Sequence, residues 1–126
     1  MGYRSEVAFR VETKTEDDLQ SVIEKLKNKW AVNTGFKWED FILDMIVYDY
    51  ELVLHGNDLK WYDGYEDVSA VMDWFWELVD DYRDNKDTVI SGIQYIRLGE
   101  DPEDVEEIWH GDLYNPMSLI RSIDLG

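Results

Sequence analysis

Four carboxylates in this 126-residue chain have a spacing that would stack them along one side of a helix. They follow the helical period at i, i+4, i+7 and i+11, and they are Asp73, Glu77, Asp80 and Asp84. Like charges at this spacing cost about 0.2–0.5 kcal/mol a pair. Carboxylates in the last turn of a helix also oppose its dipole. Interleaved lysines would remove that cost, so the pattern favours a binding site for a basic partner. A solvated face that only keeps the protein soluble is the alternative.

A second acidic stretch, residues 100–107, bears on whether this ridge imitates a nucleic acid. One carboxylate per helical turn is a charge every ~5.4 Å, whereas a DNA strand carries a phosphate every ~3.4 Å. A single row is too sparse, so residues 100–107 would have to supply a second row on the same face. The acidic residues predicted to bind a partner are Glu66, Asp73, Glu77, Asp80, Asp84, Glu100, Asp101, Glu103, Asp104 and Glu107.

Large aromatic residues provide the other candidate contact surface. One small sheet is not expected to bury all of those between residues 61 and 76, and exposed aromatic side chains mark interfaces. The residues predicted to bind a partner on this basis are Trp61, Tyr62, Trp74 and Trp76. They would anchor a partner or mediate self-association of the chain. The alternative is that Trp61 and Trp76 complete the hydrophobic core.

Residue types that perform catalysis or bind metals are scarce. The chain has no Cys, no Gly-x-Ser-x-Gly motif and no glycine-rich phosphate loop. His55 and His110 have Asp58 and Asp112 near them in sequence, but neither pair has the spacing of a recognised metal site. With 29 acids, a carboxylate pair of the glycosidase kind is expected by chance and carries no information. We therefore expect no catalytic residues, no metal and no cofactor, and an enzyme is the least favoured interpretation.

Charge is divided unevenly along the chain, which limits the classes of partner. The sequence carries 29 acidic and 12 basic residues, a net charge of −17. Residues 1–38 hold seven basic and six acidic residues (+1), and residues 39–126 hold five basic and 23 acidic ones (−18). The second part lacks the cations that bind phosphates, so direct binding to nucleic acid or anionic lipid is not expected. A basic protein, or one that normally holds nucleic acid, is the expected partner.

Composition also indicates the class of protein. With 44% hydrophobic and 14% aromatic residues, the chain is expected to fold rather than to stay disordered. It has no run of about 20 apolar residues that could span a membrane. It begins with a charged stretch instead of an apolar signal sequence. We expect a cytoplasmic protein with a single acidic α+β domain over residues 1–126.

Periodicity predicts the first elements that position these side chains. Apolar and charged residues alternate over residues 3–12, which predicts a strand with one solvated face. Thr15 is the expected N-cap of a helix that ends near residues 33–35. Residues 36–47 fit a helix or a strand, and β-branched residues favour a strand from about residue 44.

The middle of the chain predicts a hairpin, a helix and a strand. A shift in alternation indicates a turn or bulge near Asp49, between strands at about 44–48 and 51–55. Residues 65–84 carry an apolar stripe with helical spacing, opposite the carboxylates. Residues 88–98 then predict a strand.

The last part of the chain completes the fold prediction. Asp101 and Pro102 suit the start of a short acidic helix, and residues 119–125 suit a short strand. The order of elements predicts an α+β fold. Its expected form is a ferredoxin-like split β-α-β sandwich with a short C-terminal helix and strand.

Three short blocks carry a resemblance: GYRSEV at residues 2–7, KWYD at 60–63 and IRLGED at 96–101. Together they resemble a family of small acidic proteins encoded by bacteriophages and prophages and mostly called hypothetical. The resemblance implies a phage gene product that acts in the cytoplasm of a bacterial host, and it implies no particular chemistry. Small acidic phage proteins include several that block host defence or transcription machinery by binding to it.

Charge and resemblance together predict a non-enzymatic, phage-derived protein. We expect it to bind and inhibit a host protein that has a basic or nucleic-acid-binding surface. The contact would use an acidic, partly nucleic-acid-mimicking surface. The alternative is a structural or accessory module that self-associates into a homo-oligomer through exposed Trp and Tyr residues.

Overall fold

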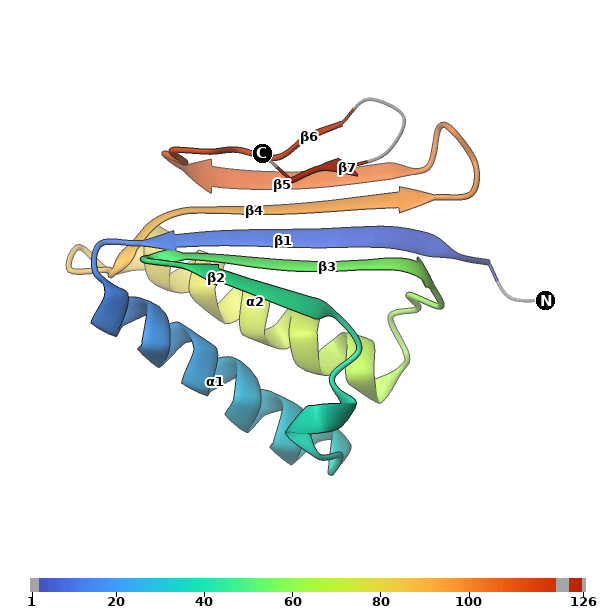
Figure 1. Cartoon of the computed structure of the whole chain (residues 1–126), viewed down its shortest axis with the longest axis horizontal. Helices are drawn as coiled ribbons and strands as arrows, with labels where there is room; N and C mark the ends of the chain where they lie inside the picture. The colour runs from blue at the N-terminus through green and yellow to red at the C-terminus, as the bar shows by residue number, and fades with distance from the viewer. Residues whose placement is uncertain (1–2, 120–122, 126) are drawn as a thin grey trace.

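The structure is a computed structural model that describes residues 3–119 and 123–125 (Figure 1). It contains two long helices and a five-stranded sheet, followed by a short strand pair. The elements are β1 (Ser5–Thr13), α1 (Glu16–Thr34), the 3₁₀ helix η1 (Trp38–Asp40), β2 (Asp44–Tyr48), β3 (Glu51–Leu59), α2 (Glu66–Asp84), β4 (Ile90–Gly99), β5 (Val105–Gly111), β6 (Ser118–Leu119) and β7 (Ile123–Asp124).

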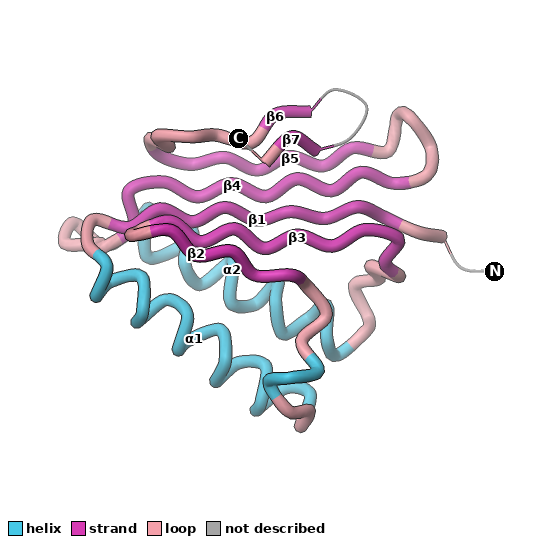
Figure 2. Tube along the Cα trace, in the orientation of Figure 1, coloured by secondary structure: helices cyan, strands magenta, loops and turns pink. Residues whose placement is uncertain are grey.

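The five-stranded sheet is antiparallel, with the strand order β2-β3-β1-β4-β5. Each long helix connects two strands that are separated in the sheet by another strand. Figure 1 and Figure 2 show both helices on the same face of the sheet. The predicted α+β class is confirmed. The strand order is not that of the predicted four-stranded ferredoxin-like arrangement, because β5 extends the sheet beyond β4.

The main core lies between the sheet and the helices, and β1 is its central strand. Its alternating residues Val7, Phe9 and Val11 are fully buried under the helices, as the period of two predicts. The predicted solvated face of this strand is wrong, because Ala8, Arg10 and Glu12 on the other side are buried too, where the C-terminal segment covers them. The Phe9 ring stacks on Tyr95 of β4, with 4.8 Å between the ring centroids. Its edge-on contact with Trp74 spans 6.2 Å and ties the sheet to α2. Aromatic contacts of this kind add to the stabilisation from burial.

Local signals place both ends of α1 as predicted. The Thr15 hydroxyl accepts a hydrogen bond from the backbone N–H of Asp18 at 3.1 Å, which satisfies one of the unpaired donors at the helix start. The helix ends at Gly35, whose φ of 71° lies in the left-handed region that glycine adopts readily. The predicted hairpin, with a turn at Asp49, and the predicted helix over residues 65–84 are confirmed as well.

The short acidic helix predicted after Asp101 is wrong. Residues 101–103 form a turn, and Val105–Gly111 is the strand β5, which pairs with β4. The β-branched and aromatic side chains of Val105, Ile108 and Trp109 favour a strand. Pairing with β4 also places Glu106 opposite Arg97, so an acidic stretch that looks helical in sequence gains a counter-charge across the sheet.

The C-terminal segment covers part of the other face of the sheet. Met117 and Ile123 are buried against Ala8 and Ile96 in a second, smaller core. Buried Gln94 fixes the segment by accepting a hydrogen bond from the Met117 N–H at 2.9 Å. The predicted strand over residues 119–125 is present in part as β6 and β7, and residues 120–122 lie outside the described residues.

Neither α1 nor α2 has the run of apolar residues that a bilayer-spanning helix requires, and the rest of the described chain contains no such helix.

Candidate functional site

The outward side of α2 displays the ridge that the helical spacing predicts, and we call Asp73, Glu77, Asp80 and Asp84 the α2 ridge. All four side chains are exposed, as is Glu66 at the start of the helix. Asp73, Asp80 and Asp84 form no ion pair with any residue that the structure describes. The ridge is therefore a row of carboxylates that is largely uncompensated from within the chain.

The neighbouring helix α1 supplies the one cation that contacts the ridge among the described residues. The Lys29 ammonium lies 2.5 Å from the Glu77 carboxylate, and 59% of the Glu77 side chain is exposed. Sequence reasoning missed this pair because it considered only cations on α2. A second lysine of α1, Lys25, adds a smaller attraction for Asp81.

Asp81 stabilises the end of α2 through side-chain hydrogen bonds. Its carboxylate accepts hydrogen bonds from the Thr88 hydroxyl, at 2.5 Å, and from the Asn85 amide, at 3.0 Å. These bonds, Thr88 first, lower the pKa of Asp81 below its ordinary value. The side chain therefore fixes the turn between α2 and β4 and is not part of the ridge.

Near the turn between β4 and β5, acidic side chains are paired with a single cation, Arg97. We call Tyr3, Arg97, Asp104 and Glu106 the Arg97 cluster. The Arg97 guanidinium contacts Asp104 through two nitrogens, at 2.6 and 3.1 Å, and Glu106 at 2.5 Å. The Tyr3 hydroxyl donates to Asp104 at 2.8 Å. The bonds from Arg97, and then from Tyr3, lower the pKa of Asp104. The bonds to Asp104, and then to Glu106, raise the pKa of Arg97.

Gly99 allows this cluster to form. A Cβ at residue 99 would collide with the Tyr3 hydroxyl and with the Asp104 carboxylate. The backbone N–H of Gly99 donates to the Asp104 carbonyl at 2.8 Å, which closes the turn. A glycine is needed here for close approach, not for an unusual backbone conformation.

The other acidic residues predicted between residues 100 and 107 form local hydrogen bonds or are exposed to solvent. Glu100 accepts a hydrogen bond from the Arg4 backbone N–H at 2.8 Å. Asp101 accepts a weak one from the Glu103 N–H at 3.4 Å. Glu107, on β5, lies 3.4 Å from the Gln94 amide, and both Glu103 and Glu107 are exposed.

The two acidic stretches lie on different flanks of α2. Glu77 of the ridge bonds to α1, whereas Met72, on another side of α2, lines a cavity together with Asp104 and Glu106. In Figure 1 the β4–β5 turn lies at the edge of the sheet, while α2 lies beneath the sheet. Within the described chain no ion pair joins the ridge to residues 100–107, and the second acidic row that nucleic-acid mimicry requires stays a prediction.

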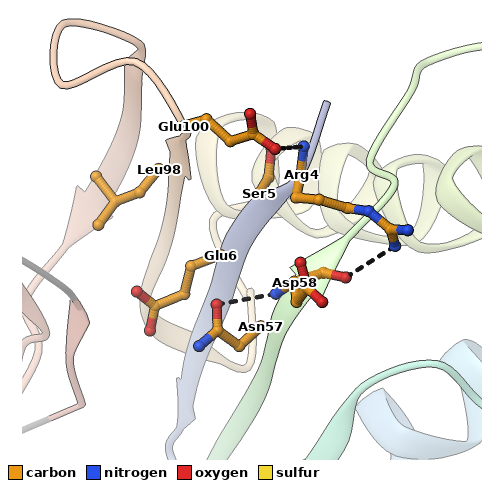
Figure 3. Close-up of a pocket in the computed structure, with 8 residues that line it drawn as sticks. Arg4, Ser5, Glu6, Asn57, Asp58, Leu98 and Glu100 are labelled. Carbon is orange, nitrogen blue, oxygen red and sulfur yellow. Dashed lines mark hydrogen bonds between the residues drawn. The ribbon is translucent and has the colours of Figure 1, made fainter. Parts of the chain in front are cut away.

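A polar cavity of about 290 Å³ opens on the sheet at the end nearest the β4–β5 turn (Figure 3). Arg4 crosses it, with its guanidinium donating to the Asp58 carbonyl at 3.2 Å. Asp58 has a φ of 56°, and its N–H is bonded to the Asn57 side chain at 2.8 Å. Figure 3 shows these donors turned toward groups of the chain itself, so the cavity presents no cluster of donors for an anion.

A second cavity, of about 260 Å³, opens beside the Arg97 cluster and has aromatic walls. We call it the aromatic pocket. The residues that line it are Tyr3, Ser5, Trp61, Tyr62, Asp63, Met72, Tyr95, Arg97, Asp104 and Glu106. Three residues predicted to bind a partner, Trp61, Tyr62 and Asp104, meet here. The pocket also brings together parts of the blocks at residues 2–7, 60–63 and 96–101, which sequence spacing alone could not place side by side.

The aromatic prediction is wrong for Trp74. Only 1% of its surface is exposed, and its indole N–H donates to the Val22 carbonyl of α1 at 3.1 Å, so it belongs to the core. Trp61 is also buried, with 7% exposed, and it reaches the surface only in the aromatic pocket. Trp76 is 44% exposed, so the alternative that it completes the core is wrong.

Both histidines sit in the sheet, away from any metal-ligand set in the described part of the chain. His55 Nε2 lies 2.7 Å from a Glu6 carboxylate oxygen, and His110 packs against Tyr82. Within residues 3–119 and 123–125, no three His, Asp or Glu side chains converge as ligands for a metal ion.

Sequence reasoning missed the exposed edge of the sheet. β2 pairs with β3 on one side, and β2 ends the strand order on its other side. Its side chains Ile46, Val47 and Tyr48 are 39%, 43% and 64% exposed. An apolar edge strand of this kind is a template for pairing with another strand. The run of β-branched residues predicted the strand, but its place at the edge depends on the topology.

Comparisons of the chain with models of protein families, with curated proteins and with solved structures found no match.

Proposed function

We propose that this chain is a non-enzymatic binding protein that attaches through the α2 ridge to a basic or nucleic-acid-binding surface of another protein. The observation that supports it is the contrast between the ridge and the other acids. Asp73, Asp80 and Asp84 are exposed without a counter-ion among the described residues, whereas Asp104 and Glu106 are held by Arg97. Carboxylates that the fold does not use are available to a cationic partner.

The α2 ridge presents its carboxylates to a partner as a single row. The row is too sparse to reproduce a duplex, so recognition rests on a complementary basic protein surface. Long-range attraction raises the rate of encounter and weakens as salt screens it. The contact is therefore expected to be salt-sensitive.

The proposal includes the origin of the chain and the finer class of its fold. The three resemblance blocks support a phage or prophage protein that inhibits a host protein in the bacterial cytoplasm. The first six long elements, β1-α1-β2-β3-α2-β4, support a ferredoxin-like core, since each of its two β-α-β units is split by an intervening strand. β5 is then an addition to the edge of that core.

Affinity capture from a bacterial extract tests the binding surface. The purified chain is compared with the variant Asp73→Asn/Asp80→Asn/Asp84→Asn. A matched control, Glu39→Gln/Asp40→Asn/Asp44→Asn, removes the same charge from exposed positions around η1 and β2. The captured protein is then purified and its affinity for each form is measured at low and moderate salt.

We expect the ridge variant to bind about tenfold more weakly at low salt, or about 1.4 kcal/mol, and the control to bind like the wild type. Equal weakening in both variants would show that net charge, and not the ridge, drives the contact. Unchanged binding by the ridge variant would refute the proposed surface.

Self-association through β2 is the second candidate function. The exposed side chains of Ile46, Val47 and Tyr48 favour it, because two copies could join their β2 edges into one continuous sheet. Sedimentation over a wide concentration range should then show a dimer that the variant Val47→Lys abolishes. A strict monomer at the highest concentration would exclude it. Two chains of net charge −17 repel each other, so this dimer should strengthen as salt is added.

A further inference from the structure

We propose that the aromatic pocket accepts an arginine side chain of the partner protein. This inference rests on the proposed function for its partner. The pocket itself is argued from its walls, its charge and its size.

The walls are aromatic and held in place. Trp61 packs against Phe9 with 6.1 Å between ring centroids. The Tyr62 hydroxyl donates to the Tyr3 carbonyl at 3.0 Å, and its ring meets Tyr65 edge-on at 5.2 Å. Aromatic faces attract cations, and a guanidinium also stacks on them through its planar surface. Rings that are already fixed lose little freedom on binding.

The charge of the pocket is negative even after its own cation is counted. Three carboxylates, Asp63, Asp104 and Glu106, line it against one guanidinium, Arg97, which leaves an excess of two negative charges. Arg97 is already bonded to Asp104 and Glu106. Asp63 is exposed, and its carboxylate forms no ion pair within the described chain. It is therefore the acceptor that an incoming guanidinium would meet.

Size and lining fit one side chain. A volume of about 260 Å³ is below that of pockets for drug-sized ligands, which start at about 300 Å³. Met72 adds an adaptable apolar wall for the aliphatic stem of an arginine. Buried Tyr95 closes the floor, and burial raises the pKa of its hydroxyl, so the floor stays neutral at physiological pH.

NMR titration of the whole chain with N-acetylarginine methylamide tests the pocket without the partner. The citrulline analogue, which has nearly the same shape and no charge, is the matched ligand control. We expect the arginine probe to shift the Trp61 indole signal and the amide signals of Tyr62 and Asp63, and the citrulline probe to leave them in place. Equal shifts with both probes, or no shift with the arginine probe up to tens of millimolar, would overturn the inference.

A pair of variants sharpens the test. Asp63→Asn removes the exposed carboxylate and should weaken the arginine probe about threefold to tenfold. Asp40→Asn removes one exposed carboxylate outside both the ridge and the pocket and should leave the probe affinity unchanged. If the two variants behave alike, the probe senses only overall charge and the pocket is not its site.

The two proposals can fail separately. If the arginine probe binds in the pocket while the triple ridge variant keeps its protein partner, the pocket stands and the ridge does not. If the ridge variant loses the partner but the probe never enters the pocket, the proposed function stands and the arginine anchor does not.

Discussion

The α2 ridge and the Arg97 cluster contain the same chemical group in two different situations. In the cluster, Asp104 receives hydrogen bonds from Arg97 and Tyr3 and holds the β4–β5 turn together. On the ridge, Asp73 and Asp80 face solvent with no ion-pair partner in the described chain. Both stretches are acidic in sequence, so the position of the cations decides the role of each carboxylate. Carboxylates that the fold uses stabilise it, and carboxylates that it does not use are available for binding.

Replacing Arg97 should have the largest effect on stability, because Arg97 is the cation that holds the carboxylates of the Arg97 cluster. Arg97→Met leaves Asp104 and Glu106 without their cation at a position where only 13% of the Arg97 side chain is exposed. Because these two carboxylates are partly exposed and can be hydrated, we expect the free energy of unfolding to fall by about 1–2 kcal/mol. Urea denaturation followed by fluorescence measures it.

Arg83→Met is the control for that experiment. Arg83 is an exposed arginine of α2 that forms no ion pair in the described residues. Its loss should change stability by less than about 0.5 kcal/mol. If the two variants were equally stable, the Arg97 cluster would not be the structural element described above.

The next largest effect is the pH dependence of stability that Asp104 contributes. Because its folded pKa is lowered from 3.8, its contribution is fully present above that value and is lost as the pH falls through the folded pKa. The urea midpoints of the wild type and of Asp104→Asn should therefore differ at neutral pH and converge as the pH falls below 3.8. A gap that stays constant through the acid range would contradict this interpretation.

The ion pair between Lys29 and Glu77 should contribute less to stability than Arg97 or Asp104 does. Its partners are 26% and 59% exposed, and exposed ion pairs stabilise proteins weakly. Glu77→Gln should lower the free energy of unfolding by about 0.5 kcal/mol or less, and the loss should vanish in high salt. A loss above about 2 kcal/mol would mean that the ridge is part of the structural framework.

Local patterns predicted most of the fold. The strand β1, the Thr15 cap of α1 and the apolar stripe of α2 each depend on neighbours in sequence, and each is confirmed. The solvated face predicted for β1 is wrong, because the C-terminal segment, which is distant in sequence, covers it. The prediction failed at residues 101–107, where acids beside Asp101 and Pro102 suggested a helix. The pairing of Arg97 with Glu106 across two strands stabilises β5 instead, and a sequence pattern does not show such a partner.

The candidate site was harder to predict for the same reason. Trp61, Tyr62 and Asp104 were singled out by residue type, but their meeting in one pocket depends on the order of the strands. Tyr3, Tyr95 and Arg97 carried no local signal for a site, since each looks like an ordinary strand residue. The burial of Trp74 follows from the packing of α1 on α2, which no spacing within α2 reveals.

The most direct test measures stability and binding together in the variant Asp73→Asn/Asp80→Asn/Asp84→Asn. Removing like charges from one helix face should leave the free energy of unfolding unchanged or raise it by up to about 0.5 kcal/mol. The affinity for the purified partner at low salt should fall about tenfold in the same protein. A variant that is clearly less stable, or one that binds the partner as the wild type does, would contradict the claim that the ridge serves binding and not folding.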